Sequence, residues 1–143
     1  MKALSVTQPW ASAMAHRLKK WETRSWPTAY RGEICIHAAK GFPAWAREFA
    51  DQVSIDYAVL EELPLGCIVA VAELTECRQT DTLVTEISEV EKAWGDYAPG
   101  RFAFRMDKVR LLDEPVQVRG ALSLWTVPPE VEREILRQLA ETA

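Results

Sequence analysis

The sequence has 143 residues, of which 48% are hydrophobic and 27% are charged, and this balance predicts one globular domain over residues 1–143. No apolar run is long enough to cross a bilayer, and Gln8-Pro9 interrupts any signal-like stretch, so we expect a cytoplasmic protein without membrane association. The net charge of −4 is uneven: residues 1–40 carry seven Lys and Arg against two Glu, and the remainder carries ten against nineteen acidic residues. This distribution predicts one local anion-attracting face and argues against a protein that coats duplex nucleic acid. A solvated charge pattern without a ligand is the alternative.

The first 40 residues are predicted to form three strands and one short helix. Residues 3–6 are a short apolar run that favours a strand, and the apolar spacing from 10 to 18 is typical of an amphipathic helix. Thr7 is the expected N-cap of that helix. Residues 21–26 alternate large and charged side chains as an extended strand does, and residues 33–39 are rich in β-branched and apolar residues.

The rest of the chain continues the mixture of strands and helices. The predicted elements are a helix over 42–60, a strand over 67–74, an acidic helical piece over 84–94, a strand over 101–112, short strands over 116–118 and 122–125, and a C-terminal helix over about 129–141. The 67–74 strand is the most apolar and is expected at the centre of the sheet. Few hydrophobic βαβ alternations occur, so the pattern predicts an α+β fold: a small, mostly antiparallel β-barrel with helices packed at its ends.

Neither a metal site nor a cofactor is expected. Cys35, Cys67 and Cys77 are odd in number and lack C-x-x-C spacing, so we interpret them as reduced thiols. His37 has no second histidine at ligand spacing, which argues against zinc. The sequence also contains no Gly-rich phosphate loop and no serine nucleophile elbow.

One short segment concentrates charge beside indoles. If residues 21–26 are extended, Glu22 and Arg24 share one face, and Lys19 at the helix end can turn onto it. Trp21 and Thr23 would then point toward the core. In a cleft, Glu22 could orient Lys19 or act as a base, and Arg24 could hold a phosphate or a carbonyl-bearing base. The alternative is a salt-bridge cluster that fixes the junction, with each exposed pair contributing at most about 1 kcal/mol.

Several residues near this segment are candidates for ligand contact. Trp26 is predicted on the Glu22/Arg24 face and is the better stacking candidate, whereas Trp10 could stack or belong to the core. Strand parity puts His37 opposite Ile36, facing out or into a groove, although a lone strand histidine is more often structural. Lys40, just past the strand end, could meet a phosphate.

Two runs carry a resemblance to a known family. The stretches 4-LSVTQPWASAMAHRLKKWETRSW-26 and 30-YRGEICIHAA-39 resemble the ASCH (activating-signal-cointegrator homology) domains, which are marked by an LSxxQPW-type opening, a Gly-x-Lys-x-x-Glu-x-Arg motif and a YRG strand ending in His-Ala. Further matches follow at 67–74, 94–104 and 114–125, so the likeness covers roughly residues 3–127.

The resemblance implies a PUA-like fold and an RNA- or nucleotide-binding cleft beside the charged segment. Some small bacterial members hydrolyse modified cytidines with a Lys, a Thr and a Glu, and RNA cleavage is attributed to others. By position, Lys19, Glu22 and Arg24 stand at the motif Lys, Glu/Thr and Arg. Arg17 replaces the motif Gly, and Glu22 stands where the amidohydrolases have their Thr, so the sequence departs from their catalytic set at that position. The later Glu is either Glu73 or one within 86–91.

Three functions remain open at this stage. The first is a binding module for single-stranded RNA or a nucleoside, modified or not, in which Trp26 stacks, Arg24 and Lys40 contact phosphate, and Gln8 reads a base edge. Its predicted contact residues are Gln8, Trp10, Lys19, Arg24, Trp26, Tyr30, Arg31, His37 and Lys40.

The second is a hydrolase of the same cleft, of ribonuclease or acylated-cytidine amidohydrolase type. Lys19, with its pKa lowered by desolvation, would be nucleophile or base. Glu22 or Glu73 would transfer protons, and Arg24 would stabilise the oxyanion. The third is a protein-partner domain without ligand chemistry. The oligomeric state is left open.

Overall fold

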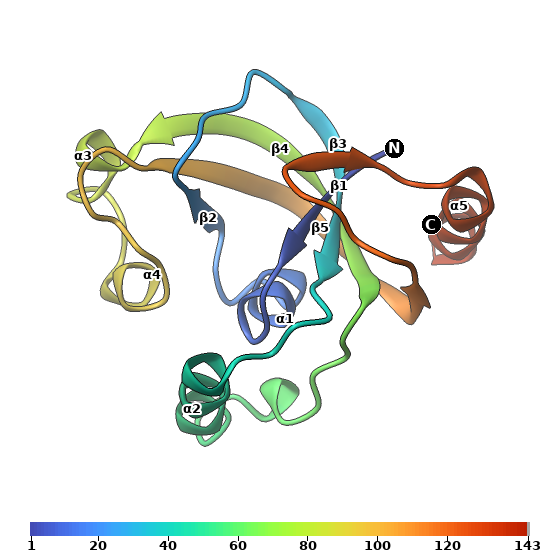
Figure 1. Ribbon diagram of the computed structural model, residues 1–143, viewed down its shortest axis with the longest axis horizontal. Coiled ribbons are helices and arrows are strands. Elements are labelled where there is room, and N and C mark those ends of the chain that lie inside the picture. Colours follow the sequence, from blue (N-terminus) through green and yellow to red (C-terminus); the bar gives the residue numbers. More distant parts are fainter. Residues whose placement is uncertain (143) are drawn as a thin grey trace.

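The computed structural model describes residues 1–142, which fold into six strands, five α-helices and one 3-10 helix (Figure 1). In chain order these are β1 Lys2–Val6, α1 Trp10–Ala15, β2 Trp21–Arg24, β3 Gly32–Ala38, α2 Ala44–Val53, η1 Ala58–Leu60, β4 Cys67–Gln79, α3 Thr80–Leu83, α4 Glu89–Ala93, β5 Phe102–Gln117, β6 Leu124–Thr126 and α5 Pro129–Thr142. None of the helices in this range is both long and apolar enough to cross a membrane.

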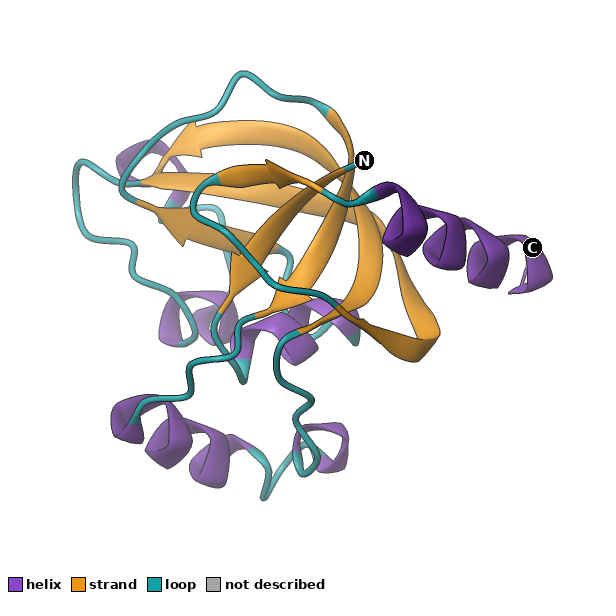
Figure 2. Cartoon of the chain, turned by 45° about the vertical axis from the view of Figure 1, so that its right-hand side comes forward, coloured by secondary structure: helices purple, strands orange, loops and turns teal. Residues whose placement is uncertain are grey.

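All six strands belong to one curled sheet. Its order is β2-β5-β4-β3-β1-β6, with β1 and β3 parallel and the other neighbours antiparallel. The register of β4 against β5 shifts at three places, and such bulges bend strands. Figure 2 shows the sheet curling round into a half-barrel, with β2 and β6 as its edges. The predicted α+β class and antiparallel character are therefore confirmed, although the barrel stays open.

Both faces of the central strands are buried, which explains their continuous apolar runs. One face packs with α1 inside the curl, where Leu4, Met14 and Phe104 are almost fully buried. The other face packs under α5, where Ile68 and Ile135 belong to a second core. The 67–74 run lies in β4, third in the sheet order, as predicted for a central strand.

The helix that follows β1 differs from its prediction. It ends at Ala15, and Pro9, not Thr7, is its N-cap. The side chain of Gln8 takes over the capping role, since its Oε1 accepts a hydrogen bond from the Ser12 backbone N–H at 2.9 Å. Arg17, which stands at the motif Gly, has a φ of 63°, a left-handed conformation that glycine adopts without steric cost.

Three other boundaries also differ. The predicted 42–60 helix is only Ala44–Val53, because Tyr57 is extended and packs edge-on against Trp94, with ring centroids 5.3 Å apart. The acidic piece at 84–94 contributes only α4, and α3 precedes it. Val116 and Gln117 are part of β5, which pairs with β4 as far as Gln117. The separate short strand predicted over 116–118 therefore does not form.

Candidate functional site

The structure brings together the three charged residues of the predicted site. Lys19 Nζ lies 3.8 Å from Glu22 Oε1. The other oxygen of Glu22, Oε2, accepts a hydrogen bond from Arg24 Nε at 3.0 Å and forms an ion pair with Arg24 Nη2 at 2.9 Å. Arg24 Nη2 also donates to the backbone oxygen of Ser5 at 2.6 Å, which ties β2 to β1. The carboxylate of Glu22 therefore lies between two cations, as the spacing predicts for an extended strand.

Lys19 is the most deeply buried member of this cluster. Its side chain is 1% exposed, and its Nζ donates to the backbone oxygen of Trp21. Burial lowers the pKa of Lys19 from its ordinary value of 10.5, and the nearby Glu22 and Glu91 carboxylates oppose that shift only in part. The carboxylates near Lys19 are thus Glu22 and a residue of the 86–91 stretch, Glu91.

Glu73, the other candidate, lies elsewhere. It forms an ion pair with Lys108, with Nζ and Oε2 3.4 Å apart. It lines a hollow beside Arg110, and not one that contains Glu22. The alternation of side chains along β4 could not predict the position of Glu73, because the register of β4 against β5 shifts between Val71 and Glu73.

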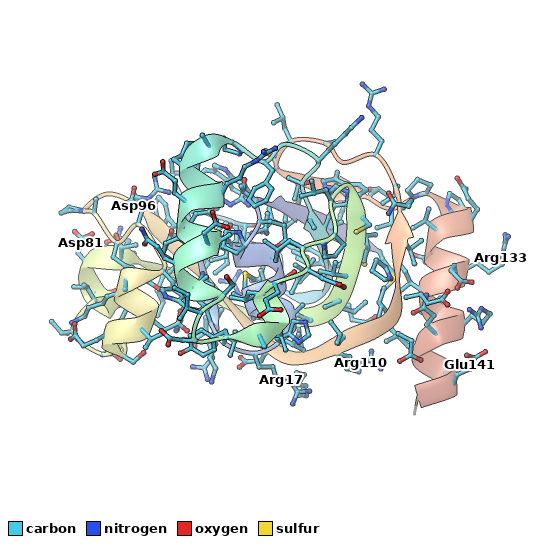
Figure 3. The ribbon with its side chains drawn as sticks, turned by 90° about the horizontal axis from the view of Figure 1, so that it is seen from below. Arg17, Asp81, Asp96, Arg110, Arg133 and Glu141 are labelled. Carbon is cyan, nitrogen blue, oxygen red and sulfur yellow. The ribbon has the colours of Figure 1, made fainter. Side chains whose placement is uncertain are left out.

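A cavity of about 520 Å³ opens beside Glu22 and Arg24. We call it the aromatic cavity; its defining side chains are Trp10, Glu22, Arg24, Trp45, Phe49 and Trp94. They come from α1, β2, α2 and the residue after α4, so four segments distant in sequence meet there. Asp96 lies at its rim, beside α2 in the view from below (Figure 3). Its volume lies within the range typical of small-molecule sites.

The rings of the aromatic cavity pack against one another in part. Trp10 stacks on Phe49 with centroids 5.0 Å apart and planes 3° apart, and Trp45 tilts against Trp10 at 5.6 Å. Phe49 meets Trp94 edge-on at 5.9 Å. Trp45 is nevertheless 63% exposed, an unusual position for an indole. Trp45 and Phe49 fall within the helix predicted over 42–60, but their place in this cavity was not predicted.

Two predicted ligand contacts are instead part of the packing. Gln8 is fully buried, and its Nε2 donates to Ser12 Oγ at 2.7 Å and to the Pro64 oxygen at 3.0 Å, so its amide has no edge left for a base. Trp26 lies past the end of β2, where strand parity no longer applies, and packs edge-on against Phe104 at 5.1 Å. Trp10 replaces it in the cavity.

Tyr30 and Arg31 also lie outside the aromatic cavity. Tyr30 Oη donates to the Glu33 oxygen at 2.5 Å. Arg31 donates to the backbone oxygens of Thr28 and Tyr30 at 3.0 and 2.8 Å. Both side chains hold the turn that leads into β3, which the sequence could not distinguish from a ligand contact.

Two buried polar atoms have no hydrogen-bond partner among the described residues. They are Glu91 Oε1 and the hydroxyl of Tyr97. Glu91 Oε2 accepts from the Lys20 backbone N–H at 2.5 Å. Burial, with Glu91 and Glu22 nearby, raises the pKa of Tyr97 well above its ordinary range. The polar atoms of Glu91 and Tyr97 are therefore not fully paired.

His37 belongs to a different network. Its Nε2 lies 2.8 Å from the Val118 oxygen, and its Nδ1 lies 2.9 Å from Ser5 Oγ. Because the carbonyl can only accept, Nε2 carries the proton and Nδ1 accepts from Ser5. Trp125 Nε1 donates to the same Ser5 Oγ at 3.1 Å. Burial lowers the pKa of His37 despite the opposing Val118 hydrogen bond. His37 is 2% exposed and both of its ring nitrogens have partners, so it offers no free polar atom to a ligand.

The last predicted residues are Lys40 and the three cysteines. Lys40 lies just past the end of β3, as predicted, and is exposed. Cys35, Cys67 and Cys77 are free thiols, and burial raises the pKa of Cys35 to about 12. Among residues 1–142, no group of three His, Cys, Asp or Glu side chains could hold a metal ion.

Known proteins share both the sequence and the fold. The sequence model described as "ASCH domain" matches residues 4–119. The chain is 32% identical over 138 residues to activating signal cointegrator 1 of Homo sapiens and 21% identical to that of Mus musculus. Each match covers 91% of this chain but only 23% of the relative, so the chain spans less than a quarter of their length.

Solved structures agree on the architecture. The crystal structure of ASCH from Zymomonas mobilis matches with a TM-score of 0.60 at 15% identity, covering 95% of this chain and 93% of that one. A mutant of the same protein matches with a TM-score of 0.60 at 16% identity, covering 95% and 96%. At such low identity the likeness establishes the fold alone.

Proposed function

This chain belongs to the ASCH domain family, whose domains are PUA-like and generally RNA-associated, and we propose that its aromatic cavity binds one base of a nucleoside or of single-stranded RNA. One observation carries the proposal: a cavity of about 520 Å³ combines three indoles and a phenyl ring with a Glu–Arg pair. Proteins that bind single-stranded nucleic acid use this combination of stacking and polar groups.

The aromatic side chains would supply most of the binding free energy. Stacking on an aromatic ring is worth about 1–3 kcal/mol per base. Trp10 is held by Phe49 and is already ordered. Trp45 is 63% exposed at the rim, and a bound base would cover part of its apolar surface. This exposed indole is hard to explain by packing within the chain.

Glu22 and Arg24 would select the base. A carboxylate accepts from an exocyclic amino group such as cytosine N4, and a guanidinium donates to ring or carbonyl acceptors. Arg24 is fixed by Ser5 and Glu22, and Glu22 by Arg24, so both groups hold their geometry before a ligand arrives. A preorganised pair loses less entropy on binding than a mobile one.

Hydrolysis in the same cavity is the second candidate. The lowered pKa of Lys19, 3.8 Å from a carboxylate of the cavity, is the observation that favours it. However, Lys19 lines a separate hollow with Lys20, Glu91 and Asp107, and its Nζ is hydrogen-bonded to the Trp21 oxygen. A nucleophile must reach the substrate, so we place binding first.

Substitution of Trp45 tests the proposal. Trp45→Ala should weaken binding of nucleosides and of single-stranded RNA about 5- to 150-fold, which corresponds to the stacking energy above. Isothermal titration with a panel of plain and N4-acylated nucleosides measures this. Leu136→Ala, which removes another exposed apolar side chain from α5, is the control and should bind as the unchanged protein does.

Two results would count against the proposal. If none of the nucleosides or RNA oligomers binds the unchanged protein, the cavity is not a base site. If Trp45→Ala binds equally well, the base lies elsewhere. Mass spectrometry of the same mixtures separates the second candidate, since only a hydrolase releases an acid or a shortened RNA.

A further inference from the structure

A second hollow, of about 970 Å³, shares one lining residue, Ser5, with the aromatic cavity. It lies where β3 and β5 end, under the loop that follows β5. We call it the basic hollow; its polar lining residues are Ser5, His37, Lys40, Gln117 and Arg119. None of the acidic side chains within residues 1–142 lines it. In a chain with a net charge of −4, this is a local concentration of positive charge.

The two cations of the basic hollow are available to a ligand. Lys40 and Arg119 are both exposed, and neither forms an ion pair with another described residue. By contrast, the cations of the charged cluster beside the aromatic cavity are engaged with Glu22. Free exposed cations in a concave site favour an anion.

Gly66 joins the two sides of the basic hollow. Its N–H donates to the Ala38 oxygen at 2.8 Å, and its oxygen accepts from the Val118 N–H at 3.2 Å. A Cβ at Gly66 would lie 3.8 Å from Cβ of Lys40 and 3.8 Å from Oε1 of Gln117. The end of β3 and the start of the Arg119 loop are therefore held side by side.

We propose that the basic hollow binds the phosphate backbone of a single-stranded RNA whose base occupies the aromatic cavity. This inference rests on the proposed function and makes it more specific, because it names an oligonucleotide, not a free nucleoside, as the preferred ligand. Ser5 lines both sites, with its backbone oxygen bonded to Arg24 and its Oγ to His37, so a strand that passes Ser5 would reach both. Single-stranded RNA binders pair stacking rings with a cationic track in this way.

The loop that carries Arg119 is fixed before binding. His37 Nε2 holds the Val118 oxygen, and the backbone of Gly120 rests on the Ser5–His37 pair. A Cβ at Gly120 would lie only 2.6 Å from Ser5 Oγ and 2.7 Å from Cε1 of His37. His37 is therefore a positioning residue for the loop, and a loop that is already ordered costs less to bind.

The test compares RNA with nucleoside. A double variant, Lys40→Gln with Arg119→Gln, should bind a fluorescein-labelled single-stranded RNA octamer of mixed sequence roughly tenfold more weakly at low salt in fluorescence anisotropy. The slope of log affinity against log salt should become shallower by about 1.4, since each phosphate contact on a single strand contributes about 0.7. Nucleoside affinity should not change.

The matched control is Lys108→Gln with Arg110→Gln. It makes the same change in net charge at two exposed β5 residues outside both sites; Arg110 is marked in Figure 3. A second variant, Gly120→Ala, should also weaken octamer binding but not nucleoside binding, because its methyl group would push the Arg119 loop away. Gly41→Ala, where nothing lies within 4 Å, is its control.

Each result decides between the two proposals. Loss of octamer affinity in the double variant beyond that of the control pair supports the basic hollow. An equal loss in both pairs, or none in either, overturns it while nucleoside binding still supports the aromatic cavity. If neither ligand binds the unchanged protein, the proposed function fails and this inference with it.

Discussion

Two groups of buried polar residues differ in how completely they are hydrogen-bonded. The Lys19 cluster consists of Lys19, Glu22, Arg24 and Glu91, and the His37 network consists of Ser5, His37, Trp125 and the Val118 carbonyl. Only the His37 network is completely paired. In the His37 network, both ring nitrogens and the Ser5 hydroxyl have partners, and no member carries a charge. The Lys19 cluster contains two cations and two carboxylates, and Glu91 Oε1 has no partner among the described residues. A buried polar atom without a partner costs about 1–3 kcal/mol.

The difference separates a structural role from a functional one. The His37 network fixes β1, β3, β6 and the Val118 loop to one another and leaves nothing for a ligand to satisfy. The Lys19 cluster faces the aromatic cavity through Glu22, and one carboxylate oxygen of Glu91 has no hydrogen-bond partner among the described residues. Incomplete pairing beside a cavity is typical of binding and catalytic sites.

Removing the histidine should have the largest effect on stability. His37→Ala should lower the free energy of unfolding by about 3 kcal/mol, because it leaves the Val118 carbonyl and Ser5 hydroxyl unpaired and opens a cavity beside Trp125. Urea denaturation measures this. His16→Ala, at the only other histidine, should cost less than about 1 kcal/mol. Loss of nucleoside binding in folded His37→Ala would contradict the separation of roles.

Removing the lysine should have a smaller effect on stability. Lys19→Met should lower the free energy of unfolding by about 2 kcal/mol, because the Trp21 carbonyl and Glu22 each lose a partner while the desolvation cost of the ammonium disappears. Glu22 keeps Arg24, which limits the loss. The same urea titration, with exposed Lys20→Met as the control, measures it. If Lys19→Met were more stable, the desolvation cost of burying the ammonium would exceed the stabilisation from its hydrogen bond and ion pair.

The sequence predicted the elements whose signals are local. The apolar run at 67–74 correctly indicated a central strand, and the spacing of Lys19, Glu22 and Arg24 correctly indicated a charged cluster at a helix–strand junction. The parity of Cys35 and Ile36 in β3 was also right, since they belong to different cores. These inferences depend only on backbone periodicity.

The sequence could not predict what depends on distant segments meeting. Trp45 and Trp94 complete the aromatic cavity, yet they stand 49 positions apart on separate helical segments, and their meeting follows from the packing of α2 and α4. Trp26 was misplaced because β2 ends two residues before it. Gln8 was misassigned because its cap to Ser12 forms only once α1 is folded.

The smallest effect is expected in the pH dependence of stability, which should distinguish the His37 network from the Lys19 cluster. Burial lowers the folded-state pKa of His37 below its ordinary value of 6.5. At a pH between the folded-state and the ordinary pKa, the unfolded chain therefore binds more protons than the folded chain. The contribution of His37 to stability should therefore be complete above pH 6.5 and fall as the pH drops below that value.

Lys19, whose pKa is lowered from 10.5, gives the same sign in the alkaline range, where stability should rise as the pH increases toward 10.5. Urea titrations from pH 5 to 10.5 on the unchanged protein and on both variants measure the slopes. His37→Ala should flatten only the acid slope and Lys19→Met only the alkaline one; if either variant flattened both, the two networks would be coupled and the comparison would fail.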